Sequence, residues 1–229
     1  LADLRVPTAT LGVAARQPAG QFAVAATAPD GGELIVKVYG RDAHDSAMLS
    51  TIQRTVWLRR PGSPVGFGRL RQVEHEALLT LLARQGGVPT ETVVIAGTTE
   101  SDDALLVLRR TGTLLVEPDR VVGPDTPPDP RFSGPHAPAA LRELWKLVDA
   151  LHRAGIAHGA IDEEHLIVVD GALGFVDFRG ASVAPSVAQF RSDDAQMFVA
   201  TVALAGRTAA VSALVANRSN EEIAAILPY

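Results

Sequence analysis

Alternating apolar and polar positions in the N-terminal half of the chain predict β-strands. Residues 21–28 and 33–39 are two such runs, and a Pro-Asp-Gly-Gly sequence at 29–32 separates them. Because glycine and aspartate adopt the backbone angles that a tight turn needs, these two runs predict a β-hairpin. Two later runs, 91–95 and 104–109, predict two more strands that a polar turn joins.

Apolar residues spaced three and four positions apart predict two long helices. They cover residues 72–84 and 138–154, and glycine follows each of them. Two short apolar runs at 166–169 and 173–178 flank a turn, and a further helix is expected from about Asp193. The expected buried face of the first helix consists of Val73, Ala77, Leu78, Leu81 and Leu82.

This order of elements predicts an α+β protein with two lobes. The N-terminal lobe, residues 1–116, is rich in strands, contains one helix and carries an insert at 41–70. A proline-rich connection at 117–138 leads to a mainly helical C-terminal lobe at 139–229. Clefts between two such lobes are a usual place for ligands.

Composition narrows the classes of protein. The chain has 229 residues, a net charge of −5, 47% hydrophobic residues and no cysteine. These values are typical of a globular protein with one bilobal domain or two small ones, and they exclude a disordered chain. Without cysteine there is no disulfide, thiolate zinc site or thiol nucleophile. The acidic balance argues against nucleic acid as a partner, because phosphate binding needs a clustered basic surface.

The ends of the chain indicate a domain of a longer protein. The chain begins at Leu1 without methionine and ends at Tyr229 in an apolar segment. No run reaches the roughly 18 apolar residues that a membrane span requires. There is also no basic region followed by an apolar stretch, so the sequence predicts no signal peptide.

Lysine is scarce, and its positions are therefore informative. Lys37 and Lys146 are the two lysines in a chain with 21 basic residues. Lys37 lies in the strand predicted at 33–39, where a compact ammonium group can meet a phosphate that a wide guanidinium group would not fit. The alternative is a strand lysine that faces solvent.

Two segments of the C-terminal part resemble protein and small-molecule kinases. Residues 151–168 resemble a helix that runs into a kinase catalytic loop, in the His-Gly-Asp form of aminoglycoside phosphotransferases and lipopolysaccharide kinases. Residues 174–179 resemble the Asp-Phe-Gly motif on its short hairpin. The resemblance implies a bilobal protein-kinase-like fold, with a small β-rich N-lobe and a mainly helical, shortened C-lobe.

The resemblance also implies roles for particular residues. Lys37 would bind nucleotide phosphates and would pair with Glu76, or with Glu74, of the first helix. Asp177 would hold a divalent metal, so the implied cofactors are ATP or ADP with Mg²⁺ or Mn²⁺. Two further residues have implied structural roles. His158 would pack inside the catalytic loop, and Asp194 would accept hydrogen bonds from the loop's backbone N–H groups.

The sequence departs from the kinase pattern at several functional positions. Ala160 stands where the catalytic aspartate would accept the proton of the attacking hydroxyl. His165 replaces the asparagine that helps to hold the metal, and imidazole suits Mn²⁺ or Zn²⁺ better than Mg²⁺. The glycine-rich phosphate loop is degraded, and Arg179 replaces the glycine of Asp-Phe-Gly. These losses predict a pseudokinase.

Three functions stay open on the sequence. The first is a regulatory pseudokinase that binds nucleotide, and the second is a scaffold that binds none. The third is an active phosphotransferase for a small molecule or lipid headgroup, with Asp162 as a displaced base. Asp193 follows Asp177 by 16 positions, which is too short for a peptide-docking segment, so we expect no peptide substrate.

A narrower resemblance concerns the N-terminal kinase-like region of actinobacterial flippase-like membrane proteins, whose transmembrane part is similar to lysylphosphatidylglycerol synthase. It rests on residues 38–42, 71–77, 104–108, 158–159 and 227–229. The resemblance implies a regulatory domain at the cytoplasmic face of the cell membrane. Its implied partners are its own transmembrane domain, anionic lipid headgroups or a regulatory protein.

The insert fits a membrane setting. It carries Trp57 and several arginines that could rest on anionic headgroups or on the membrane domain. The alternative is a helix that covers the small lobe, with Trp57 in the core. The basic residues concerned are Arg54, Arg59, Arg60, Arg69 and Arg71.

Overall fold

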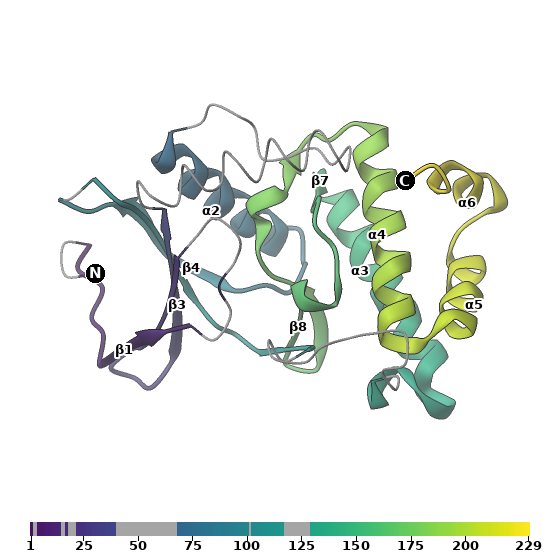
Figure 1. Ribbon diagram of the computed structural model, residues 1–229, viewed down its shortest axis with the longest axis horizontal. Helices are drawn as coiled ribbons and strands as arrows, with labels where there is room; N and C mark the ends of the chain where they lie inside the picture. Colours follow the sequence, from purple (N-terminus) through teal and green to yellow (C-terminus); the bar gives the residue numbers. More distant parts are fainter. Residues whose placement is uncertain (2–3, 15–16, 18–21, 40–67, 101, 117–128) are drawn as a thin grey trace. The chain divides into compact units, whose positions relative to one another are not determined.

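A computed structural model describes residues 1, 4–14, 17, 22–39, 68–100, 102–116 and 129–229 (Figure 1). Most of the insert at 41–70 and of the connection at 117–138 therefore lies outside the described residues. The chain forms two compact units. The first consists of Leu1–Leu81, Glu91–Gly112 and Asp177–Gly180, and the second of Leu82–Thr90, Thr113–Val176 and Ala181–Tyr229. The domain boundaries 1–116, 117–138 and 139–229 stay a prediction.

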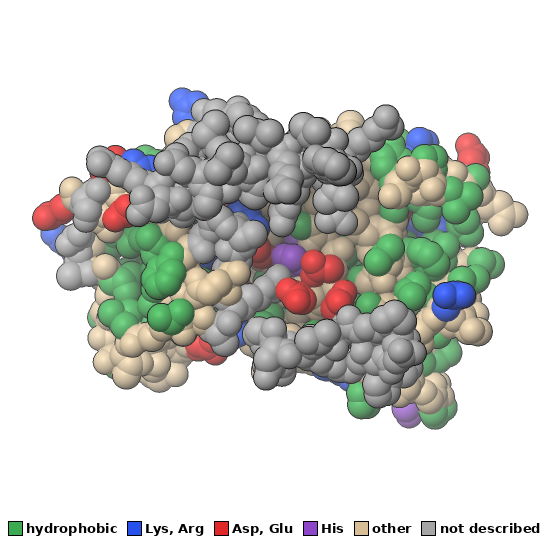
Figure 2. Space-filling view, viewed as in Figure 1, with side chains coloured by type: hydrophobic (Ala, Val, Ile, Leu, Met, Phe, Trp, Pro, Cys, Tyr) green, Lys and Arg blue, Asp and Glu red, His purple; other side chains and the backbone are tan. Residues whose placement is uncertain are grey.

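The first unit is built on an antiparallel five-stranded sheet with the order β1-β2-β3-β5-β4. The strands are β1 (Thr10–Val13), β2 (Phe22–Thr27), β3 (Glu33–Tyr39), β4 (Thr92–Thr98) and β5 (Ala104–Arg109). The predicted hairpin is confirmed, because β2 pairs with β3 and Gly31 occupies the turn at φ +83°. Hydrophobic side chains gather over this sheet in Figure 2, and the edge strand β1 exposes Leu11 and Val13.

Alternate residues of β5 pack on opposite faces of the sheet, as strand geometry requires. Leu105 and Val107 pack on one face in a cluster with Leu34 and Val36 of β3. The other β5 side chains pack against helix α2 (Arg69–Gln85) and Tyr39. This second cluster consists of Tyr39, Val73, Ala77, Ala104, Leu106 and Leu108.

The buried face of α2 differs from the predicted one. Leu78 and Leu81 are each 49% exposed, whereas Glu76 is fully buried. The helix is rotated so that Glu76, and not the leucine-rich stripe, lies against the sheet beside Val73 and Ala77. Apolar spacing alone missed this, because the predicted face included Leu78 and Leu81 and left out Glu76 and the fully buried Leu79.

The second unit is mainly helical and contains two small sheets. Its helices are α3 (Ala137–Arg153), α4 (Val187–Ala205), α5 (Arg207–Asn217) and α6 (Asn220–Ile226). The small sheets have the orders β6-β8-β9 and β10-β7. Their strands are β6 (Thr113–Leu114), β7 (Ile156–Ala157), β8 (Leu166–Val169), β9 (Ala172–Phe175) and β10 (Ser182–Val183). Trp145, Phe175 and Met197 are among its fully buried side chains.

Helix α4 begins at Val187, earlier than the predicted start near Asp193. A reciprocal capping box at Ser186 and Gln189 explains the earlier start, because each side chain accepts from the backbone N–H of the other residue. Asp193 therefore lies inside the helix. Within the described residues, no helix combines the length and the apolarity that a membrane crossing needs.

Candidate functional site

Lys37 lies at the centre of a buried polar cluster in the first unit. Its Nζ atom donates to Oε1 of Glu76 and, at 2.8 Å, to Oδ1 of Asp177. Lys37 is 4% exposed, so the alternative of a solvent-facing strand lysine is wrong, and Glu74 on the exposed face of α2 is not its partner. The structure thus brings together the three residues predicted to bind nucleotide, whereas the predicted metal residue His165 is not among the partners of Lys37.

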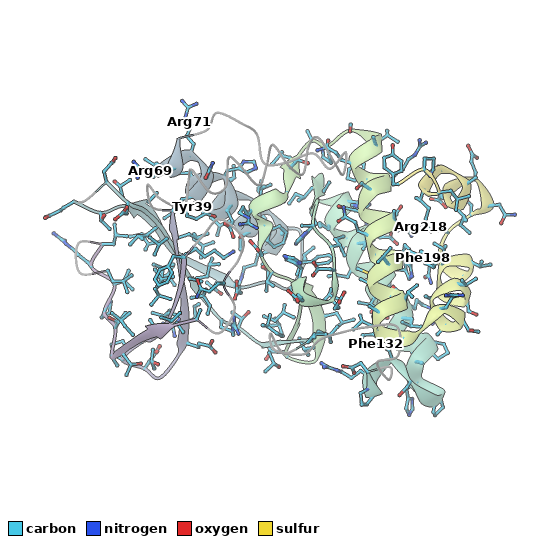
Figure 3. The ribbon with its side chains drawn as sticks, viewed as in Figure 1. Tyr39, Arg69, Arg71, Phe132, Phe198 and Arg218 are labelled. Carbon is cyan, nitrogen blue, oxygen red and sulfur yellow. The ribbon has the colours of Figure 1, made fainter. Side chains whose placement is uncertain are left out.

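Tyr39 is a member of this cluster that the sequence analysis missed. Its hydroxyl donates to Oε2 of Glu76, and the residue is 4% exposed (Figure 3). Side chains two positions apart on a strand point to the same face, so Tyr39 and Lys37 both face α2. That spacing was the available signal, because a tyrosine two positions from a functional lysine shares its surroundings.

Asp177 reaches the cluster from a tight turn. It adopts φ +64°, a left-handed conformation that is uncommon for residues other than glycine. The short 3₁₀ helix Phe178–Gly180 follows at once, and Phe178 is fully buried. Arg179, which replaces the glycine of Asp-Phe-Gly, lies within this 3₁₀ helix.

Burial and neighbouring charges together set the pKa values of Lys37 and Tyr39 in the cluster. Burial alone would lower the pKa of Lys37, but the carboxylates of Asp177 and Glu76 raise it above its ordinary value. Burial, together with the charge of Glu76, raises the pKa of Tyr39 well above its usual 10.0. The lysine is thus a fixed positive charge and the tyrosine a neutral hydrogen-bond donor at physiological pH.

A second buried carboxylate, Glu91, interacts electrostatically with Lys37, Glu76 and Asp177. Glu91 is 4% exposed, and its Oε1 lies 3.7 Å from Nε of Arg110. Burial raises the pKa of Glu91, while the positive charges of Lys37 and Arg110 oppose the rise. The sequence analysis did not single out Glu91, because it treated the residue only as the first position of a strand.

The second unit contains the loop that resembles a kinase catalytic loop. The backbone N–H groups of His158 and Gly159 donate to the two carboxylate oxygens of Asp193, at 2.7 and 2.8 Å. His158 is fully buried, and its Nε2 lies 3.1 Å from the carbonyl oxygen of Val176. His152 also contacts the Asp193 carboxylate, at 3.2 Å.

The assignment of this bracing role to Asp194 is wrong. Asp194 faces away from the loop, and its Oδ1 accepts from Nη2 of Arg218 at 2.7 Å. Arg218 also donates to Asp149 and stacks 4.7 Å above the ring of Trp145, so it joins α3 to α4 (Figure 3). Neighbouring residues on a helix point about 100° apart, so only one of the two aspartates can reach the loop.

Asp162 and His165 lie together after Ala160 in this loop. Oδ1 of Asp162 accepts from the backbone N–H groups of Glu164 and His165, and it contacts Nδ1 of the His165 ring. The same oxygen thus caps the 3₁₀ helix Glu163–His165 and orients the imidazole. A carboxylate partner on one ring nitrogen is also usual for histidines that bind metals through the other.

Two residues carry the predicted metal chemistry. Asp177 offers a carboxylate of the kind that Mg²⁺ and Mn²⁺ prefer, and it is close to the phosphate-binding candidate Lys37. His165 offers an imidazole that suits Mn²⁺ better than Mg²⁺. Among the described residues, no three His, Asp or Glu side chains form a ready-made metal cluster.

A sequence comparison with known proteins agrees with a kinase-like domain. No protein-family model matches the chain. A probable serine/threonine-protein kinase BUD32 homolog from Archaeoglobus fulgidus is 31% identical over 110 residues, or 48% of this chain. The chain spans only 46% of that relative's length. The chain is also similar to the solved structure of vaccinia related kinase 3, with 14% sequence identity and a TM-score of 0.45. The match covers 87% of this chain and 68% of that structure.

The sequence match and the topology point the same way. The N-terminal sheet carries the strand lysine, the helix between β3 and β4 carries its glutamate partner, and the remainder is mainly helical. The described residues therefore form an α+β domain that is similar, over 48% of the chain, to a probable protein kinase homolog.

Proposed function

We propose that this chain is a catalytically impaired kinase-like domain, a pseudokinase, that binds ATP or ADP with Mg²⁺ or Mn²⁺. The observation that carries the proposal is the buried pair of Lys37 and Glu76 with Asp177 bonded to the same ammonium group. A fixed ammonium group beside a metal-competent carboxylate is what a triphosphate requires. A divalent cation held by Asp177 would supply positive charge against the phosphates of the nucleotide.

Nucleotide binding redistributes the partners of Lys37. Asp177 would hold the cation, and Lys37, which donates to both Asp177 and Glu76 in the structure, would supply positive charge to the phosphates while it stays paired with Glu76. Without a divalent cation, the phosphates would add negative charge beside three carboxylates, Glu76, Glu91 and Asp177. We therefore expect nucleotide to bind much more weakly in the absence of metal.

Catalysis is impaired at Ala160, because a methyl group neither orients a hydroxyl nor accepts its proton. Asp162 is the carboxylate that follows Ala160 most closely in the sequence. Its Oδ1 accepts hydrogen bonds from two backbone N–H groups and contacts the ring of His165. These contacts favour a capping role for Asp162 over the role of a base.

A thermal-shift titration with ATP and ADP, with and without Mg²⁺ or Mn²⁺, tests the proposal. Nucleotide at 100 times its Kd adds about 2.7 kcal/mol to the free energy of unfolding. We expect this metal-dependent shift without phosphate release. Lys37→Met should weaken ATP about tenfold or more, because it removes a hydrogen bond between charged groups. The matched control is Lys146→Met, which replaces the exposed lysine of α3 and should leave the affinity unchanged.

Other outcomes of this titration would assign a different function. No shift with any nucleotide would contradict nucleotide binding and favour the scaffold. Steady ATP turnover would contradict the pseudokinase and favour an active small-molecule or lipid-headgroup phosphotransferase. The BUD32-like relative is named a probable serine/threonine-protein kinase, so it supports phosphoryl transfer but not a small-molecule or lipid acceptor. Turnover should then disappear in Asp162→Asn, which keeps a capping side chain but removes the base.

We further propose that this domain regulates a polytopic membrane protein from the cytoplasmic face of the cell membrane. The support is the arginine-rich and tryptophan-containing insert, most of which lies outside the described residues. Its partners would be its own transmembrane domain, anionic lipid headgroups or a regulatory protein, and not nucleic acid or peptide. Co-flotation with anionic vesicles, but not with neutral ones, would support the lipid contact, and equal co-flotation with both would contradict it.

A further inference from the structure

The carboxylate of Glu76 is held at both of its oxygens by two side chains of one strand. Lys37 donates to Oε1 and Tyr39 to Oε2, and both donors belong to β3. The backbone of Glu76 is restrained as well, because its carbonyl oxygen accepts from the Thr80 hydroxyl at 2.8 Å. Glu76 is fully buried, so all of these contacts are shielded from water.

A buried carboxylate needs a donor at each oxygen. Burying a charge without partners costs several kcal/mol, and removing one donor leaves the other partner to hold the group alone. Hydrogen bonds at both oxygens fix the orientation of the Glu76 carboxylate plane. If Lys37 were the sole donor, the carboxylate could rotate about χ3, whose energy minima are broad.

We propose that Tyr39 is a positioning residue, whose hydroxyl fixes the Glu76 carboxylate and through it holds the Lys37 ammonium group in place. The role rests on the proposed nucleotide binding, because it matters most when Asp177 turns to a metal ion. Glu76 then retains Lys37, and Tyr39 keeps Glu76 from following the lysine. Tyr39 is suited to this role because burial and the charge of Glu76 keep its phenol protonated.

The scarcity of lysine allows a direct test on the free protein. Lys37 and Lys146 are the two side-chain amines of the chain, and Lys146 is 60% exposed at its side chain. Brief labelling with an amine-reactive ester, followed by mass spectrometry of the two peptides, gives the ratio of Lys37 to Lys146 reactivity. We expect Tyr39→Phe to raise this ratio about threefold or more, because the loosened ammonium group leaves its carboxylates more often.

Three comparisons separate positioning from loss of stability. Tyr229→Phe removes the hydroxyl of the other tyrosine, which is 59% exposed, and should leave the ratio unchanged. Val36→Ala weakens the opposite face of β3 and should change the ratio less than Tyr39→Phe at equal loss of melting temperature. Adding Tyr39→Phe to Glu76→Gln should raise the ratio no further, because Tyr39 acts through Glu76.

Each contrary result overturns the inference. An unchanged or lower ratio in Tyr39→Phe shows that the hydroxyl does not restrain Lys37. An equal rise in Val36→Ala reduces the effect to stability, and a further rise on the Glu76→Gln background shows that Tyr39 acts by another route. The labelling needs no nucleotide, so its failure is separate from failure of the nucleotide titration.

Discussion

The choice between two adjacent aspartates decides which residue braces the loop around His158. Asp193 accepts from the N–H groups of His158 and Gly159, and substitution by alanine leaves both donors without that acceptor. We expect Asp193→Ala to lower the free energy of unfolding by about 3 kcal/mol, as measured by urea denaturation. In Asp193→Ala, amide hydrogen exchange at His158 and Gly159 should also increase by a larger factor than exchange at the buried Leu106 in β5.

The matched control for this prediction is Asp194→Ala. It removes one of the two carboxylates that pair with Arg218, so some stability is lost. Exchange at His158 and Gly159 should not accelerate beyond Leu106, because neither amide contacts Asp194. If Asp194→Ala exposed those two amides as much as Asp193→Ala does, the bracing role would have to be reassigned.

At the residue scale, the order of the kinase motifs along the chain was the more informative guide to the site residues. Lys37, Glu76 and Asp177 were chosen because they match kinase motifs in the right order, and the structure brings them together. Tyr39 belongs to no such motif, so only the geometry of β3 reveals it. Motif order did not distinguish Asp193 from Asp194, because a motif locates a position only to within one residue where two candidates are adjacent.

At the scale of elements, the capping box of α4 is the feature that most changes the fold expected from sequence. Ser186 accepts from the N–H of Gln189, and substitution by alanine leaves that donor without its cap. We expect Ser186→Ala to lower the free energy of unfolding by about 1 kcal/mol, and Ser186→Thr to lower it less. Urea denaturation of the three proteins measures the difference.

Ser212 offers a serine of the same size without a capping role. It lies in α5, is exposed, and its hydroxyl only returns to the carbonyl oxygen of Thr208. Ser212→Ala should therefore change stability by no more than about 0.5 kcal/mol. Equal losses from Ser186→Ala and Ser212→Ala would mean that the cap does not stabilise α4.

Strands were easier to predict than helix faces and helix starts. The apolar and β-branched runs at 33–39 and 104–109 match β3 and β5, because both are central strands that are packed on both faces of the sheet. Helix α4 was placed too late because the apolar pattern weakens across the polar stretch that begins at Arg191. Ser186 and Gln189 were the better signal, since capping residues mark a start even where the helix is polar.

At the scale of the whole molecule, the two compact units do not follow the order of the chain. Asp177 lies 140 positions after Lys37 and nevertheless belongs to the same unit. Hydrophobic periodicity cannot predict a contact between residues so far apart in the sequence, because it reports only on neighbours within one helix or strand. The α+β class was predictable from the order of strands and helices, whereas the interleaving of segments depends on where the turn at Asp177 packs.

The stability of the whole molecule should depend on pH through the buried cluster of the first unit. Burial raises the pKa of the Glu91 carboxyl above its ordinary value of 4.5, although Lys37 and Arg110 oppose the rise. A carboxyl with a higher pKa in the folded than in the unfolded protein binds its proton more tightly when folded. Its contribution to the free energy of unfolding is therefore present below pH 4.5 and is lost as the pH rises through the folded pKa.

Glu91→Gln replaces this carboxyl by a neutral group of the same shape, so the variant no longer loses stability when Glu91 ionises. We expect it to be more stable than the wild type at pH 7 and nearly equal to it at pH 4, as measured by urea denaturation at both values. Glu221→Gln, at an exposed position of α6, controls for the loss of one surface carboxylate. A Glu91→Gln protein less stable than the wild type at pH 7 would mean that the attraction of Lys37 and Arg110 outweighs burial, and that Glu91 is held ionised as a partner of those two cations.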